Sequence, residues 1–491
     1  MSLYSIKKIN RIILVLLISI IIACFSTFSW LIFNDNVKSW GLILFIIFLI
    51  GYIIFCLVLD SFAVFLVVSI MSLMIGTKIH VNPINDYFSG VGASSLFISV
   101  VHIVFFLGLI SFVIKALKNE KIINDLTNFN SKFYLVFIFI IYSFLIALTA
   151  NFKDASFAQF SHYLSLFGVY SLWIIMFRNF SKKKLLSIII YSLSTVVIIE
   201  FILLALQLIE GSPLGLSLLG EGRIGQRIGV PFASVTGTFG HPGPLSMFFL
   251  AVSLIFFPFV LQKKYKILLF SFILACLGIV FTFSRTSIII FCLLIMVELF
   301  FLQKFAGKKI LSKSKIIILI IVFFLGISVM SPFIISRFDS LQNSNDDQFG
   351  NRYYHNLFAF EYIKERPMLG YGLNNWIYSV SKENFIASEY NDPFFFKNPV
   401  HNIYLLVWFE GGIVYLLIFL SLFLVHIKFL FRRFKQNSDP FILGIGISIV
   451  SFMLYGFLGK ALHSYSQLLY LLFFLFAVIN HFQTINDKND R

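Results

Sequence analysis

Charged side chains are scarce in this sequence, and their scarcity decides the class of protein. Only 12% of the 491 residues are charged and 59% are apolar, whereas soluble domains carry about a quarter charged residues. Cysteine is rare too: the four cysteines all lie in apolar runs, which argues against a disulfide framework or a thiolate metal site. A cleavable leader is not expected, because the first apolar run, 12–33, is long enough to remain a membrane helix. The composition therefore predicts a polytopic membrane protein.

Apolar runs of spanning length recur along the whole chain. We predict an all-α fold with about 14 transmembrane helices, 12 or 13 being the alternatives. They are expected near 12–33, 41–59, 61–76, 95–114, 133–150, 162–178, 185–209, 244–261, 267–283, 286–302, 316–336, 402–427, 440–457 and 464–481. The weakest assignments are the pair 41–76, which needs a turn at Asp60-Ser61, and the last hairpin, around Lys460.

The net charge of +16 could suggest a nucleic-acid partner, but the basic residues follow the predicted topology instead. With the N-terminus inside, 25 of the 38 lysines and arginines fall in inner segments and seven in short outer loops. The positive-inside rule then predicts that both termini are cytoplasmic. The expected location is the bacterial cytoplasmic (inner) membrane, with the active site on its outer face and no nucleic-acid partner.

Two outer segments interrupt the apolar pattern, and the longer one divides the chain into three parts. Residues 1–336 hold predicted helices 1–11 with a Gly-rich outer loop at 210–243. Residues 337–400 form one long extracytoplasmic loop, and residues 401–491 hold helices 12–14. Within the long loop, "NRYYHNLFAFEYIKERP" predicts a helix near 352–365 that ends before Pro367, because the residue before a proline disfavours helical geometry.

Three arginines in the short outer loops are candidates for binding an anion. Arg223 and Arg227 lie four residues apart, so one helical turn would place both on one face. Arg285 lies in "FTFSRTSIII", at an outer turn between two helices. Guanidinium groups bind phosphate oxygens in a fork, which suits a lipid-linked pyrophosphate. The alternative is that these arginines anchor their loops to lipid phosphates or to Glu221.

His401 begins a predicted transmembrane helix directly after the long loop. At 100° per residue, Leu405, Trp408 and Gly412 share its face, which would form a groove for an isoprenoid tail or a neighbouring helix. An imidazole at the water boundary could accept a proton from a sugar hydroxyl. Equally, His401 could help to start the helix, with Asn398 or Asn402 as partners.

The remaining polar residues suggest structural roles. Glu200 lies in the middle of a predicted span, with Gln207 on nearly the same face, and we favour an interhelical hydrogen bond for it over a functional role. His102 and His463 are interpreted as structural. No spacing supplies the convergent oxygens of a hard-cation site, so neither a metal nor another cofactor is predicted.

Four short stretches, in order, resemble the bacterial O-antigen ligase and O-antigen or capsule polymerase superfamily. The first three are "GTFGHPGPLSMFFL", "FTFSRTS" and "RYYHNLFAFEYIKERPMLGYGLNNW". The fourth is "HNIYLLVWFEGGIVY", which is His-Asn, nine residues, then Gly-x-x-Tyr. The resemblance covers roughly residues 220 to 427; before about residue 200 the chain matches only as generic hydrophobic spans. In "GHPGP", His241 and Gly243 replace the asparagines that are common in the family.

This resemblance implies a glycosyltransferase that takes a glycan from an undecaprenyl-pyrophosphate carrier without a metal or nucleotide. It implies that His401 and Arg285 are catalytic and that Arg352 is the loop arginine. The arginine before Gly-Thr-Phe would be Arg223 or Arg227. The expected partners are the lipid-linked oligosaccharide, membrane lipids, a flippase that supplies the substrate and a chain-length regulator.

Three functions remain open from the sequence. The preferred one is an inverting O-antigen or capsular polysaccharide polymerase that joins lipid-linked repeat units. The second is an O-antigen ligase, which would transfer the glycan to a lipid A core or a protein. The third is a flippase or transporter of lipid-linked oligosaccharides; it would need charged residues near the bilayer midplane, where Glu200 alone is deep.

Overall fold

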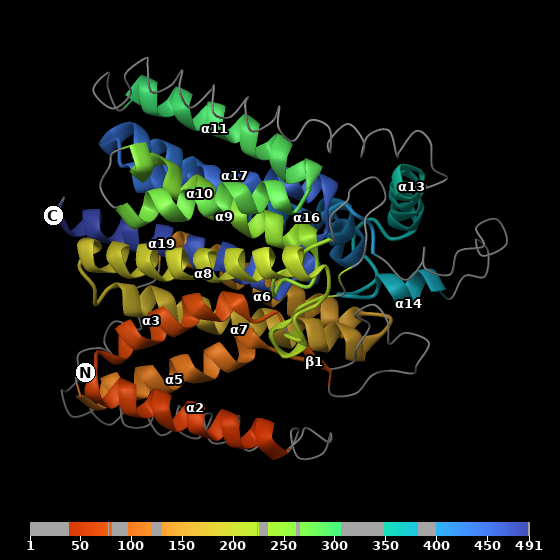
Figure 1. The fold of residues 1–491 in the computed structure, drawn as a ribbon. Helices are drawn as coiled ribbons and strands as arrows, with labels where there is room; N and C mark the ends of the chain where they lie inside the picture. Colours follow the sequence, from red (N-terminus) through yellow and green to blue (C-terminus); the bar gives the residue numbers. More distant parts are fainter. Residues whose placement is uncertain are drawn as a thin grey trace.

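The computed structural model describes residues 39–76, 78–80, 97–118, 130–222, 224, 234–261, 266–305, 348–381 and 399–489. This part of the chain forms a bundle of helices that lie side by side (Figure 1). Eight helices are long and apolar enough to cross a membrane: α5 (Val100–Lys118), α6 (Ser131–Thr149), α7 (Lys153–Phe177), α8 (Lys182–Glu210), α9 (Pro242–Leu261), α11 (Arg285–Phe305), α16 (Ile403–Asn437) and α17 (Pro440–Leu458). The protein is therefore a polytopic membrane protein.

Shorter apolar stretches occur in four further helical elements: α2 (Ser39–Val58), α3 (Ser61–Met71) with the 3-10 turn η1 (Ser72–Met74), α10 (Lys266–Phe281) and α19 (Ser466–Asn489). These twelve helical regions lie where the hydropathy pattern predicts spans, although α7 begins nine residues early and α16 ends ten residues late. The predicted spans 12–33 and 316–336 fall outside the described residues.

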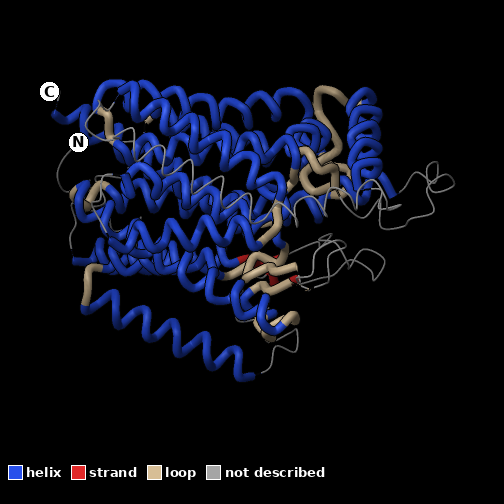
Figure 2. Tube along the Cα trace, turned by 45° about the horizontal axis from the view of Figure 1, so that its top comes forward, coloured by secondary structure: helices blue, strands red, loops and turns tan. Residues whose placement is uncertain are grey.

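The prediction of an all-α fold is confirmed for the described residues, which contain one short pair of strands besides the helices. Strands β1 (Lys78–His80) and β2 (Phe97–Ser99) form an antiparallel pair in which Lys78 lies opposite Ser99 (Figure 2). The span predicted at 95–114 therefore starts as a strand, and its helix begins only at Val100. An apolar run as short as "FIS" fits either structure, and here the partner strand decides.

The two ends of the bundle differ in composition. One end, here called the loop end, carries α13 (Gln348–Glu365), α14 (Trp376–Ser381) and the N-terminus of α16 (Figure 1). At the opposite end Asp60 caps α3 and pairs with Lys115 and Lys184, at 2.8 and 3.3 Å. The predicted turn at Asp60-Ser61 is therefore present. Lys182 and Asp439 form a further ion pair of 2.5 Å at this basic end.

Helix α9 lies inside the bundle and packs against both α10 and α17 (Figure 1). Of its most apolar window, 89% is buried within the protein, so α9 faces protein rather than lipid. Gly444 of α17 lets the two backbones approach closely, because a Cβ there would lie 2.8 Å from the Ile255 carbonyl oxygen. This packing fixes the N-terminus of α9 and the C-terminus of α17, which both lie at the loop end.

Candidate active site

Helix α16 begins at the loop end with Ile403, two residues after His401. The side chain of Asn402 accepts hydrogen bonds from the backbone N–H groups of Tyr404 and Leu405, at 3.0 and 3.2 Å, and so caps the helix. His401 lies one residue before the cap, and its side chain is partly exposed. The side chain that caps the start of the helix is therefore that of Asn402.

A second histidine lies against His401. His355 comes from α13, and the two imidazole rings stack with centroids 5.9 Å apart and planes within 5° of parallel. The His355 side chain is buried, at 5% exposure. The sequence reasoning missed His355, although it lies only three residues after Arg352 in the stretch that resembles the family. The stacking fixes one ring face of His401 against α13.

The helix that follows His401 is broken at Gly412. This glycine has φ 74° and ψ −177°, a backbone conformation that is essentially restricted to glycine. The freed N–H of Ile413 donates to the Pro367 carbonyl oxygen at 2.8 Å, and the indole N–H of Trp408 donates to the same oxygen at 3.1 Å. A Cβ at Gly412 would lie 1.9 Å from the Met368 carbonyl oxygen. Chain from residues 367–368 therefore occupies the space beside Gly412, where the sequence predicts a groove on the His401 face.

The segment after Pro367 continues along the broken helix. The N–H groups of Tyr371 and Gly372 donate to the carbonyl oxygens of Phe409 and Glu410, both at 2.9 Å. Gly370 has φ 66°, and a Cβ there would lie 2.5 Å from the Glu410 carbonyl oxygen. The pattern Pro-x-x-Gly-x-Gly at 367–372 thus supplies the chain that pairs with the break. After the break, residues 413–437 extend about 37 Å at 1.5 Å per residue, enough to cross a hydrocarbon core of about 30 Å.

Glu410, beside the break, is a buried carboxylate that the sequence reasoning also missed. Its Oε1 accepts from the Asn374 backbone N–H at 2.8 Å and lies 2.8 Å from His463 Nε2. Among the described residues, its Oε2 has no hydrogen-bond partner. The signal was present, because a lone glutamate within an apolar run is costly unless it is partnered. His463 lies on α18 (Ala461–Ser464), so this pair ties the α17–α19 connection to α16.

The Gly-Thr-Phe sequence before α9 is held by two polar residues of α8. Glu200 accepts hydrogen bonds from the Thr238 hydroxyl and backbone N–H, at 2.5 and 3.1 Å. Gln207 accepts from the backbone N–H of Gly237 at 2.9 Å. A Cβ at Gly237 would lie 2.3 Å from the Glu200 carboxylate, which explains the glycine. Glu200 therefore has the structural hydrogen-bonding role that we favoured from the sequence. Its partner is the loop before α9 rather than a second helix.

Arg285 is the first residue of α11, and the turn around it is fixed to α9. The hydroxyl groups of Ser287 and Ser246 lie 2.7 Å apart, and Ser246 also donates to the Gly243 carbonyl oxygen at 2.7 Å. A Cβ at Gly243 would lie 2.9 Å from the Tyr455 hydroxyl of α17. The turn that carries Arg285 therefore reaches α17 through the start of α9.

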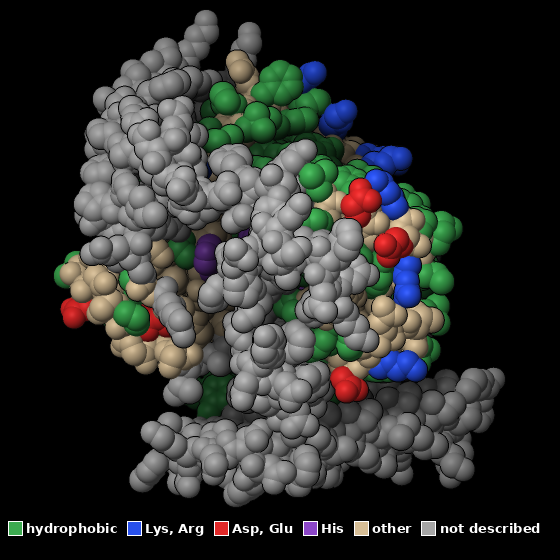
Figure 3. Space-filling view, turned by 90° about the vertical axis from the view of Figure 1, so that its right-hand side faces the viewer, with side chains coloured by type: hydrophobic (Ala, Val, Ile, Leu, Met, Phe, Trp, Pro, Cys, Tyr) green, Lys and Arg blue, Asp and Glu red, His purple; other side chains and the backbone are tan. Residues whose placement is uncertain are grey.

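Helix α17 completes the connection to the start of α16. Its Gly456 packs against Ile403, and its Met453 carbonyl oxygen accepts from the Tyr404 hydroxyl at 2.7 Å. Arg285 and His401 consequently lie at the same end of the bundle, linked through α9 and α17. Viewed from this end, histidine side chains lie in a recess of the surface (Figure 3).

The structure describes no side chain for the other three predicted arginines. Arg223 and Arg227 fall outside the described residues, and Arg352 lies in α13 without a described side chain. Glu221, the alternative partner for the first two, accepts from Gln207 at 2.7 Å and from the N–H groups of Leu214 and Leu216, at 2.7 and 2.6 Å. Within the described part of the chain, no cluster of three or more His, Cys, Asp or Glu residues could hold a metal ion.

Another cation at the loop end is Lys460, between α17 and α18. Burial lowers the pKa of its ammonium group to about 7, because the surrounding protein disfavours the charged form. Nearby, burial raises the pKa of the Tyr465 hydroxyl to about 12, with a further contribution from Tyr455.

Comparison with known families identifies the region that contains these features. Residues 270–420 match the sequence model of the O-antigen ligase family. The chain therefore carries an O-antigen ligase family domain, which includes Arg285, Arg352 and His401. Proteins of this family are glycosyltransferase-type ligases and polymerases that act on lipid-linked glycans in polysaccharide biosynthesis. The match is narrower than the resemblance at 220–427 and leaves out Arg223, Arg227 and the Gly-Thr-Phe loop. No curated protein matches the chain significantly.

Proposed function

We propose that this protein is a polymerase that joins undecaprenyl-pyrophosphate-linked glycan repeat units into an O-antigen or capsular polysaccharide. The observation that supports the proposal is the family match at 270–420 together with the position of Arg285 and His401 at the same end of the bundle. The basic residues at the opposite end, Lys115, Lys182 and Lys184, favour a cytoplasmic position for that end. The loop end then faces the outer side of the cytoplasmic membrane, and both termini are cytoplasmic.

In this mechanism the acceptor hydroxyl oxygen attacks the anomeric carbon of the lipid-linked sugar. The bond from that carbon to the pyrophosphate oxygen breaks, and undecaprenyl pyrophosphate leaves with the bonding electrons. His401 takes the proton of the acceptor hydroxyl as general base, and His355 holds the ring in place. One displacement inverts the anomeric configuration, and no metal takes part.

The negative charge that develops on the leaving pyrophosphate needs cationic donors. Arg285 supplies a planar fork for two phosphate oxygens. Arg352 and either Arg223 or Arg227 would complete the anion site. In this proposal, Trp408 borders the path of the carrier lipid, whereas Gly412 acts through the helix break.

An O-antigen ligase is the second candidate, favoured by the name of the matching family. The two reactions differ only in the acceptor: a polymerase extends another lipid-linked unit, and a ligase modifies a lipid A core or a protein. Deletion of the gene separates them by gel analysis of surface glycans. Loss of the long ladder with one repeat unit retained supports the polymerase, and long chains left on the carrier support the ligase.

The direct test compares two neighbouring substitutions in purified protein supplied with a synthetic lipid-pyrophosphate oligosaccharide. Removing a general base costs about 10² to 10⁴ fold in rate, so we expect His401→Ala to abolish measurable transfer without lowering the melting temperature. Asn402→Ala is the matched control; losing the helix cap should cost about 1 kcal/mol of stability while transfer continues. A well-folded His401→Ala protein that transfers at more than about a tenth of the normal rate would refute the catalytic assignment.

A further inference from the structure

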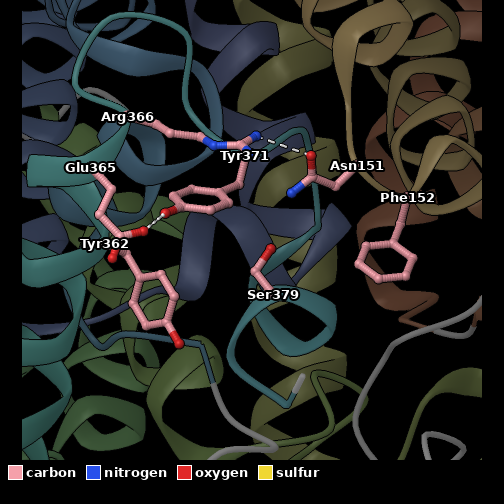
Figure 4. Close-up of a pocket in the computed structure, with 7 residues that line it drawn as sticks. All are labelled: Asn151, Phe152, Tyr362, Glu365, Arg366, Tyr371 and Ser379. Atoms are coloured by element: carbon pink, nitrogen blue, oxygen red, sulfur yellow. Dashed lines mark hydrogen bonds between the residues drawn. The ribbon is translucent and has the colours of Figure 1, made fainter. Parts of the chain in front are cut away.

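A polar cavity of ≈ 430 Å³ lies at the loop end, lined in part by the stretch 352–376 that resembles the family. Its walls come from the connection between α6 and α7, from the end of α13 and from the chain that follows Pro367 (Figure 4). This volume is within the range of about 300–1,000 Å³ that is typical of small-ligand sites. Neither the general base nor the pyrophosphate site described above uses this cavity.

The side chains of the cavity are held in position before any ligand arrives. The Tyr371 ring lies between Phe409, stacked at 4.7 Å, and the Arg366 guanidinium, whose carbon is 4.9 Å from the ring centroid. The Tyr371 hydroxyl donates to Glu365 at 2.7 Å, and Arg366 donates to the Asn151 side-chain oxygen at 3.0 Å (Figure 4). Such fixed groups lose little conformational freedom on binding.

Much of the hydrogen-bonding capacity of this cavity is unused. Arg366 has five N–H donors, and among the described residues no carboxylate lies within ion-pair distance of it. Ser379 is only 8% exposed, and its hydroxyl has no hydrogen-bond partner in the described part of the chain. Ser379 lines the cavity (Figure 4). A buried polar group without a partner is costly, so a ligand that bonds to Ser379 would remove this cost.

The charges of the cavity select the chemical class of ligand. Arg366 offers donors and Glu365 offers an acceptor, and their charges cancel. An anionic ligand would be repelled by Glu365, and a cation by Arg366. A neutral molecule with neighbouring hydroxyl groups satisfies both, because each hydroxyl donates one hydrogen bond and accepts others. The vicinal hydroxyls of a pyranose ring have this chemistry.

We propose that this cavity is a glycan subsite that binds a neutral pyranose unit of the acceptor through Arg366, Glu365 and Ser379. This inference rests on the proposed function, since it assumes that an acceptor glycan reaches His401. Helix α13 supplies the geometry: Tyr362, in the cavity wall, follows His355 by two helical turns, about 10 Å along the axis. The sugar bound in the cavity is therefore a unit beyond the one that carries the reacting hydroxyl.

The first test measures binding by calorimetry. The probe is the oligosaccharide repeat unit released by mild acid from the surface glycan of the host, titrated into purified full-length protein. We expect Ser379→Ala and Arg366→Met each to weaken binding about tenfold, the effect of losing one or two hydrogen bonds. Lys364→Ala is the control, because this exposed lysine pairs with Glu361 outside the cavity. Periodate oxidation of the probe, which cleaves vicinal diols, should abolish the binding of wild type.

Ser379→Ala also separates a subsite from a structural role. Removing an unpartnered buried hydroxyl should leave the melting temperature unchanged or raise it, so weaker binding by this variant cannot be attributed to misfolding. Equal affinity in wild type, Ser379→Ala and Arg366→Met would overturn the subsite, as would the absence of binding to wild type.

Kinetics distinguish failure of the subsite from failure of the proposed function. If wild type transfers glycan, the two variants should raise KM for the acceptor about tenfold with little change in kcat. Unchanged KM in an active enzyme would refute the subsite alone. A wild-type protein that binds the probe as expected but never releases the carrier pyrophosphate would refute the proposed reaction and leave the glycan site standing.

Discussion

Replacing Gly412 by alanine tests the break in α16 and the chain that fills it. The backbone conformation of Gly412, φ 74° and ψ −177°, costs about 1–3 kcal/mol for a residue with a side chain. The new Cβ would also lie 1.9 Å from the Met368 carbonyl oxygen, so the chain around Pro367 must move away. Its two hydrogen bonds to Ile413 and Trp408 contribute about 1 kcal/mol each. We therefore expect Gly412→Ala to lose about 3–5 kcal/mol of stability.

Thermal unfolding in detergent, followed by intrinsic fluorescence, measures this loss. Gly446→Ala in α17 is the matched control, because its Cβ would meet nothing closer than Leu430 at 3.5 Å. Without a clash, alanine should stabilise the helix by up to about 1 kcal/mol. If Gly412→Ala melts with wild type or above it, residues 367–372 do not occupy the break. A stable variant that fails only to bind carrier lipid would restore the interpretation of Gly412 as an open groove.

Two further predictions concern substitutions of cationic residues at the loop end. Arg285→Lys should lose nearly as much activity as Arg285→Ala, because lysine keeps the charge and loses the planar fork; the expected loss is about 10² fold or more, and near-normal turnover of the lysine variant would leave only a general electrostatic role. Lys460→Met should raise the melting temperature more at pH 7 than at pH 10. The pKa of Lys460 is lowered to about 7, so above that pH the unfolded chain binds more protons and wild-type stability rises as the pH increases. Equal gains at both pH values would contradict the lowered pKa.

The bundle was largely predictable because hydropathy acts over whole helices. A run of twenty apolar residues needs a bilayer or a buried position whatever its neighbours are. The ends of some helices were also predictable from local sequence. Asp60 caps α3, and α13 ends before Pro367 because the residue before a proline disfavours helical geometry.

The details of the site could not be predicted from hydropathy or local sequence, since they depend on contacts between segments that are distant along the chain. Pairing of 367–372 with α16 sets the break at Gly412, and the adjacent Gly411-Gly412 was the only local sign of a kink. His355 gains its position from the packing of α13 against α16, which no spacing along the chain reveals. Glu410 was detectable from its charge, but its partner His463 was not.

The interlocking of residues 367–372 with the first turns of α16 affects how such proteins can be recombined. The two segments lie about thirty residues apart in sequence, yet four backbone or indole hydrogen bonds join them, and Gly370 and Gly412 leave room for the partner backbone. A chimera that takes one segment from a relative and keeps the other would bring together surfaces that never evolved to fit. Exchanges between members of the family should therefore carry both segments as a single module, whatever glycan the donor protein uses.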